Sequence, residues 1–350
     1  MYIFVLPNYT APSNVSVLTR LARIDWVGFI LHASTVVLFP MALTFGGVVW
    51  AWDSGSTIAI WVVWGVALIS YIVQQYFCLF TTVEDRLFPA YLLKNRVVAL
   101  VALASATVLL AHPVALYYLP LFYAFARGHH ALASAVRLLP YICVCIVASL
   151  ISGAALRKIG RFSLFFLFSG ALFLVGGVLM SRIDEYTPES TVMGYSSLVG
   201  FGVGLTLPHA FTIANAVLPR LDHRFDAAAL MVIAQLGTTS ITLAITGAVF
   251  QNVGFRFLKD AVKESGTTRP FTDEEIRGAL SGVISSLFHS GDPNLAALAI
   301  HAVTDIIRRL FYMIVAAGAL CMLTSLFMGW QKLNFDVAPK KETDAEAGPV

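Results

Sequence analysis

The sequence predicts an all-α integral membrane protein with about eight transmembrane helices. Of its 350 residues, 58% are hydrophobic and only 12% are charged, whereas a soluble domain carries roughly 25% charged residues. The mean hydropathy is +0.79. The charged residues also divide the chain into successive apolar runs. Each run is long enough to cross a bilayer as a helix, which takes about 20 residues.

Eight such runs follow one another, and none of them contains Asp or Glu. Buried helices of a large soluble protein are the alternative explanation of a single apolar run, but eight in succession favour membrane spans. We predict transmembrane helices at 27–48, 57–78, 98–120, 136–156, 162–181, 194–217, 228–250 and 311–331.

The predicted topology follows from the distribution of Lys and Arg. These residues gather in alternate loops, whereas the other short turns hold only Arg127 and Arg182, with Arg137 near a helix end. Because cytoplasmic loops carry an excess of Lys and Arg, both termini of this multi-pass protein are expected in the cytoplasm. The plasma membrane is the expected location.

The longest segment between two predicted spans, 251–310, is expected on the outer side and carries two helix signals. Thr272 with Glu275 fits a capping box, and Asp292 before Pro293 fits an N-cap followed by proline at the first helical position. Two short surface helices are therefore predicted, and the second continues into the last span. They could contact the membrane surface or pack over the outer mouth of the bundle.

An ordered series of short motifs carries a resemblance to a known family. The motifs are IDWVGF (24–29), LTFGG (43–47) with WAW (50–52), LLKNR (92–96), YYLPLF (117–122), VRLLPY (136–141), GAALRKIGR (153–161), GFGVGLTLP (200–208) and AQLGTTSITLAITGAVFQN (234–252). From about residue 2 to 335, the chain resembles the carboxy-terminal portion of the fourteen-span drug:proton antiporters of the major facilitator superfamily. It most resembles the toxin-efflux branch of filamentous fungi.

The resemblance implies a major-facilitator-like helical bundle whose amino-terminal half is absent, so that the eight spans match the family's last eight. We interpret the chain as a carboxy-terminal piece of a longer transporter, or as a gene model that begins too late. The implied divisions are a cytoplasmic linker with the remnant of a preceding helix (1–24), an additional central helix pair with its cytoplasmic loop (25–96), a six-helix transporter half with a long outer loop (97–335), and a cytoplasmic tail (336–350).

The function implied by the resemblance is efflux of apolar small molecules such as toxins, secondary metabolites or drugs. Export would proceed by proton antiport and alternating access, with the proton gradient as energy source and no cofactor. The implied partners are the lipid bilayer, the apolar substrate and a missing amino-terminal half. The net charge of +3 gives no reason to expect a nucleic-acid partner.

The sequence argues against one other function class and leaves a second one open. An enzyme is disfavoured because the sequence has no HExxH motif, acid pair or Gly-rich phosphate loop. The four cysteines lack the spacing of a zinc site, so no metal site is expected. A non-transporting membrane fragment, or a regulatory partner of a full-length transporter, stays open as the alternative.

The motif GAALRKIGR resembles the family's cytoplasmic signature. The resemblance implies that Gly153 allows close helix approach, Gly160 a tight turn, and that Arg161 is the closing cation. The family usually has an acid where this chain has Arg157, which argues against a charge-relay gate. The alternative role of the motif is a cationic inner loop that fixes orientation.

Other residues suggest helix bending and close packing. Pro120, Pro140 and Pro208 lie inside or at the ends of predicted spans, where each removes a backbone hydrogen bond and permits a kink. Gly200 and Gly204 form a small-xxx-small pair that lets two helices touch closely.

Six residues are candidates for the substrate pathway. They offer either aromatic surface or polar groups within a span: Tyr117, Tyr118, Phe122, His209, Asn215 and Gln235. Ordinary packing and structural hydrogen bonding are the alternatives for each. Because no carboxylate lies deep within a span, proton coupling would need either a histidine or a group in the missing helices. We favour the missing helices.

Overall fold

The structure is a computed structural model that describes residues 16–83, 85–218, 221–267, 269–282, 285, 287–288, 292–330 and 332–333. These residues contain helices and no strand, which confirms the predicted all-α class. The helices are α1 (Val17–Ala22), α2 (Trp26–Phe45), α3 (Gly55–Phe77), the 3₁₀ helix η1 (Ala90–Lys94), α4 (Arg96–Arg127), α5 (Ala131–Val136), α6 (Leu139–Ile159), α7 (Phe162–Met180), α8 (Glu189–Thr206), α9 (His209–Val217), α10 (Leu221–Glu264), α11 (Asp273–Ala279), α12 (Pro293–Leu310) and α13 (Tyr312–Phe327).

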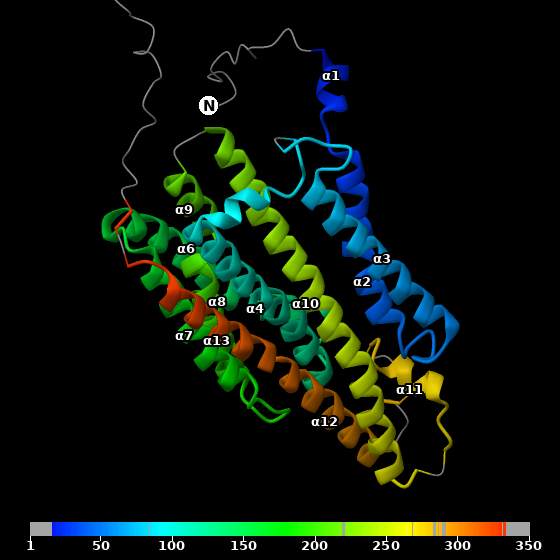
Figure 1. Cartoon of the computed structure of the whole chain (residues 1–350). Helices are drawn as coiled ribbons and strands as arrows, with labels where there is room; N and C mark the ends of the chain where they lie inside the picture. Colours follow the sequence, from blue (N-terminus) through cyan, green and yellow to red (C-terminus); the bar gives the residue numbers. More distant parts are fainter. Residues whose placement is uncertain are drawn as a thin grey trace, which may run out of the picture.

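Eight helical segments of the described chain are long and apolar enough to cross a membrane. Each predicted span overlaps one of them, so the predicted number of spans is confirmed. The α11 end of the bundle also holds α12 and the turn between α2 and α3, whereas α1 and η1 lie at the opposite end (Figure 1). The Gly160 turn lies at that opposite end, where its carbonyl accepts a hydrogen bond from the amide of Leu333, beyond α13.

The hairpin of α2 and α3 is closed at the α1 end by a buried carboxylate. Asp25 is only 4% exposed and is the N-cap of α2, where it accepts a hydrogen bond from the amide of Gly28 at 2.8 Å. It also accepts hydrogen bonds from the side-chain amides of Gln74 (3.0 Å) and Gln75 (2.8 Å) and from the backbone amide of Leu87 (3.2 Å). One acid therefore joins both helices to the loop that follows them.

Glycines set the spacing of the most closely packed helices. A Cβ atom built on Gly200 would lie 2.6 Å from the carbonyl oxygen of Tyr141, and one on Gly204 would lie 2.2 Å from that of Cys145. Because real Cβ atoms do not approach so closely, α8 can lie against α6 only with glycine at both positions. This is the close approach that the spacing of the two glycines predicts.

The segment after residue 250 differs from the expectation of a loop with two surface helices. Helix α10 continues to Glu264, and α11 begins with the predicted Thr272–Glu275 capping box. Asp292 caps α12 as predicted, and one face of α12, with Asn294 and His301, is exposed. Its apolar stripe, which includes Leu295, Val303 and Ile307, is buried. The stripe packs against α10 and α4 because a partner face within the bundle is available to cover it.

Candidate functional site

A pocket of about 840 Å³ lies at the α11 end of the bundle. Four elements form it: the end of α2 with the following turn, α4, α10, and α11 with the residues after it. The lining residues are Thr44, Phe45, Val48, Val49, Tyr117, Tyr118, Leu121, Leu243, Gly247, Phe250, Gln251, Glu274, Arg277, Gly278, Leu280 and Ser281. Most of these residues are aromatic or aliphatic, and a few carry polar groups, which is typical of small-molecule sites.

Two consecutive tyrosines of α4 form the aromatic wall of this pocket. Tyr118 is 1% exposed, and its ring lies 5.9 Å from that of Phe250. Tyr117 is 59% exposed, and its ring meets that of Tyr118 edge-on at 5.0 Å. The buried ring thus supports the exposed one at the pocket surface. Phe122, by contrast, is fully buried against Tyr123 and does not line the pocket.

Helix α11 brings charged groups to the pocket. Glu274 and Arg277 lie in the wall, and the Arg277 guanidinium carbon is 4.2 Å from the ring centroid of Phe255. The Nη1 atom of Arg277 is buried and has no hydrogen-bond partner among the described residues. Buried polar groups usually have partners. A shift of this side chain would allow it to donate to an oxygen atom of a bound molecule.

A second, smaller pocket of about 160 Å³ lies between α2, α3 and α10. Its lining includes Phe39, Trp64 and Ile241, and it is apolar almost throughout. The rings of Phe39 and Trp64 are 5.4 Å apart. This pocket can accept apolar groups but offers little to orient them.

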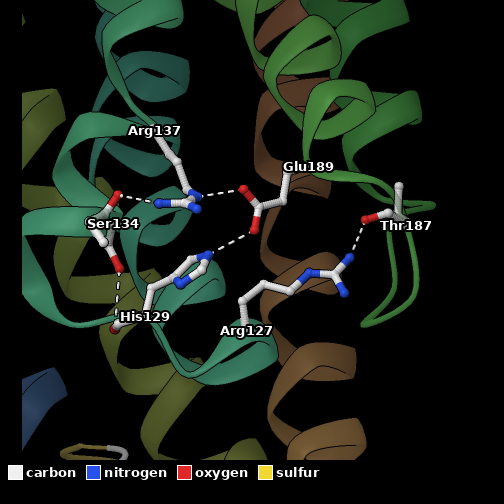
Figure 2. A network of polar contacts seen from close by, with 7 residues as sticks. Arg127, His129, Ser134, Arg137, Thr187 and Glu189 are labelled. Atoms are coloured by element: carbon white, nitrogen blue, oxygen red, sulfur yellow. Dashed lines mark hydrogen bonds and ion pairs between the residues drawn. The ribbon is translucent and has the colours of Figure 1, made fainter.

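At the α11 end of the bundle, an ionic network links the start of α8 to the residues around α5 (Figure 2). The carboxylate of Glu189, the first residue of α8, accepts a hydrogen bond from Nε of Arg137 at 2.5 Å. Its other oxygen lies 2.7 Å from Nε2 of His129. Arg127, the last residue of α4, donates to the carbonyl oxygen of Thr187 (Figure 2). The network joins the α4–α5–α6 segment to the start of α8.

The sequence did not single out this network as a site. Arg137 lies near the end of a predicted span, and Glu189 is the last of three acids before another predicted span. The two residues are 52 positions apart, so no local pattern connects them. The unusual placement of Arg137 at the edge of a predicted span is the one signal that could have prompted a search for its partner.

The polar candidates lie away from the large pocket. His209 begins α9, is 2% exposed, and packs edge-on against the ring of Phe165 at 5.6 Å. Asn215 is half-buried on α9, and Gln235 is half-buried on α10. His209, Asn215 and Gln235 are all absent from the lining of the pocket that contains Tyr117 and Tyr118. The structure therefore brings together two of the six candidates.

The residues of the GAALRKIGR motif occupy the end of α6 and the start of α7. Gly160 has φ +68° and caps α6, which is the expected tight turn. Arg157 lies in the last turn of α6, and Arg161 is the N-cap of α7. The close helix approach expected at Gly153 is not found, because a Cβ atom there would meet no described atom within 4 Å.

The three prolines have different surroundings. Pro120 lies inside α4, which continues past it to Arg127. Pro140 is in the first turn of α6, where the missing N–H costs no helical hydrogen bond. Pro208 separates α8 from α9 and so divides one predicted span into two helices.

No protein-family model matches the chain, but individual relatives do. An efflux pump of Aspergillus clavatus, patC, is 34% identical over 337 residues, which cover 95% of this chain and 60% of the relative. The MFS-type transporter patC of Penicillium expansum is 33% identical over 94% of this chain and 59% of its own length. The phomenoic acid biosynthesis cluster MFS-type transporter of Leptosphaeria maculans is 30% identical over 93% of this chain. The chain spans about three fifths of the length of the first two.

Proposed function

Because this chain belongs to the major facilitator superfamily, we propose that it forms part of a membrane efflux transporter for apolar small molecules. The observation that carries this proposal is the 840 Å³ pocket with its aromatic wall of Tyr117, Tyr118 and Phe250. Its volume falls within the range of about 300–1,000 Å³ that small-molecule sites occupy. The names of the relatives, efflux pump and MFS-type transporter, support the same activity.

The charged groups of α11 would orient the substrate. Aromatic and aliphatic walls bind an apolar body without fixing its direction, whereas a small number of polar groups fixes orientation. Arg277 supplies guanidinium donors at one wall, and Glu274 supplies an acceptor. We therefore expect substrates to have an apolar body with at least one oxygen-bearing end. Secondary metabolites, toxins and drugs include such molecules.

The proposed setting is the plasma membrane, with both termini in the cytoplasm and the α11 end outside. The excess of Lys and Arg in alternate loops supports this orientation. We further propose that export is driven by proton antiport with alternating access. Since Asp and Glu are absent from the eight predicted spans, the coupling carboxylate would belong to an amino-terminal half that completes the transporter.

A binding experiment tests the pocket with the chain as it exists. The purified chain is placed in nanodiscs and titrated with Nile red, with empty nanodiscs as background. Tyr117→Ala is expected to weaken binding about fivefold or more, because it removes an exposed aromatic wall. Tyr76→Ala is the matched control, since Tyr76 is an exposed tyrosine of α3 outside the pocket. Equal affinity of both variants and the unmodified chain would refute the pocket assignment.

A transport experiment separates this proposal from the second candidate, a non-transporting fragment that associates with full-length transporters. The second candidate rests on the finding that the chain spans only about three fifths of the length of these relatives. Cells that express the chain alone are expected to show no proton-dependent dye export. Coexpression with the amino-terminal portion of the Penicillium expansum relative is expected to produce export that a protonophore abolishes. Binding of the two pieces without export would support the non-transporting fragment.

A further inference from the structure

A basic pocket of about 470 Å³ lies where α7 ends and α12 passes into α13, away from the aromatic pocket. Five residues line it: Ser181, Arg182, Arg308, Arg309 and Tyr312. Three guanidinium groups thus share one small cavity. The planar guanidinium group matches phosphate oxygens with paired hydrogen bonds, so arginine is over-represented at sites that bind phosphate.

The residues that line this pocket include three arginines and no carboxylate. Asp305 forms ion pairs with both Arg308 (2.5 Å) and Arg309 (2.9 Å), so one acid serves two arginines. Asp184 also lies near enough to Arg308 to interact with its charge, but its carboxylate accepts hydrogen bonds in its own loop. The exposed side chain of Arg182 has no hydrogen bond or ion pair with any described residue. Its donors are available to a ligand.

The exposed apolar residues place this pocket at the edge of the lipid-facing surface. On α7 they include Phe168, Val175 and Val178, and Arg182 follows one turn later. On the last span they begin at Tyr312 and continue along α13, whereas the described residues of α12 expose no large hydrophobic side chain. Both helices therefore change from apolar to charged at the same level. Tyrosine is enriched at this level of a membrane, where lipid headgroups lie.

The two walls of the pocket are held at a fixed separation. A Cβ atom on Gly177 of α7 would lie 2.9 Å from the backbone nitrogen of Val315 on α13. The helices can approach so closely only because this position has no side chain. The end of α7, and with it the backbone that leads to Arg182, therefore lies close to the α12–α13 junction.

We propose that this pocket binds the phosphate group of a phospholipid in the leaflet at the α11 end. Arg182, Arg308 and Arg309 contact the phosphate oxygens, and the ring of Tyr312 lies against the start of the acyl chains. The lipid fills a gap between two helices at the headgroup level and adds a link between α7 and the α12–α13 junction. This assignment concerns the helix bundle and holds whether or not the chain takes part in export.

Native mass spectrometry of the full chain in detergent, titrated with phosphatidylglycerol, tests the proposal. Arg182→Gln is expected to weaken lipid binding about tenfold, because it removes a charge-assisted contact to phosphate. The variant should fold normally, since Arg182 has no partner to lose, and circular dichroism checks this. Arg182→Lys retains the charge and is expected to recover part of the affinity.

The matched control is Arg256→Gln, which removes an exposed arginine of α10 outside the pocket. It is expected to bind phosphatidylglycerol like the unmodified chain. Equal losses in Arg182→Gln and Arg256→Gln would overturn the site and indicate general charge attraction. Displacement of the lipid by millimolar inorganic phosphate or glycerol phosphate would overturn the lipid assignment and identify a free-phosphate site instead.

Discussion

Glu189 and Arg137 form a 2.5 Å hydrogen-bonded ion pair across 52 residues of sequence. The pair connects the C-cap residue that follows α5 to the first residue of α8. His129 lies on the other oxygen of the same carboxylate. The start of α8 is therefore fixed to the segment that joins α4 and α6 by a single acidic side chain.

Replacing this acid is expected to loosen the α11 end. Glu189→Gln should lower the free energy of unfolding by about 1 kcal/mol, because the pair is partly exposed and water screens it. The melting temperature in detergent should fall by about 2 °C. Glu264→Gln, at an exposed acid near the end of α10, serves as control and should leave the melting temperature unchanged. If Glu189→Gln melted at the same temperature as the unmodified chain, the network would contribute nothing to stability.

Two glycines of neighbouring helices should respond in opposite ways to alanine. Gly204→Ala places a Cβ atom 2.2 Å from the backbone oxygen of Cys145 and should cost about 2 kcal/mol or more, since α8 and α6 must separate. Gly153→Ala meets no described atom and should stabilise α6 by about 0.5–1 kcal/mol. Yield and thermal unfolding of both variants provide the measurement. If Gly204→Ala were as stable as Gly153→Ala, the observed helix separation would be wrong.

The buried acid of the α2–α3 hairpin should tolerate even a small change poorly. Asp25→Asn keeps one acceptor but turns an NH₂ group toward donors, so the hydrogen bonds from Gln74 and Gln75 cannot all survive. We expect a loss of about 2 kcal/mol and faster proteolysis of the 79–95 loop. Asp53→Asn, at the exposed turn between the two helices, is the control. Unchanged proteolysis in Asp25→Asn would contradict the prediction.

The loop between α7 and α8 should be acid-sensitive. The Thr187 hydroxyl donates to the Asp184 carboxylate at 2.6 Å and, together with the backbone amide of Tyr186, holds the pKa of Asp184 below its ordinary value. A depressed pKa contributes stability that is complete above about pH 4 and is lost as the pH falls through the folded-state pKa. Hydrogen exchange across 181–188 should therefore be constant from pH 7 to 5 and rise only in stronger acid, after correction for intrinsic rates.

Removing the hydroxyl gives the matched test. Thr187→Val should raise the pKa of Asp184 and move the onset of faster exchange to higher pH. Thr239→Val removes a hydroxyl that bonds only to its own helix, at the carbonyl oxygen of Gln235 (3.0 Å), and should leave the onset in place. The same onset in all three proteins would show that Thr187 does not stabilise the carboxylate.

Local patterns account for the parts of the fold that the sequence predicted well. The intervals between charged residues located eight spans because a charge in lipid is costly wherever the helix packs. The Thr272–Glu275 capping box and the Asp292 N-cap were visible because a helix start satisfies its own amides within three residues. The Gly200–Gly204 pair was visible for a similar reason, since four residues bring both to one helix face.

The sites could not be predicted in the same way. Tyr117 and Phe250 lie on different helices, and α11 reaches their pocket only because α10 continues to Glu264. Composition does not reveal where an apolar helix ends when its last turns pack against another helix, so the end of α10 was predicted at residue 250 instead of 264. His209 and Gln235 resembled pathway residues by polarity alone, and their distance from the pocket became clear only in three dimensions.

The sequence by itself determined that the described part of this protein consists largely of membrane-spanning helices, how many that part contains, and where most of them begin and end. These properties depend on the transfer of each segment from water to lipid, which is a sum over neighbouring residues. Only the tertiary structure decided which side chains meet: Glu189 with Arg137, Tyr118 with Phe250, and Arg182 with the α12–α13 junction. Such contacts depend on helix rotation and spacing, which are set by packing between segments far apart in the chain.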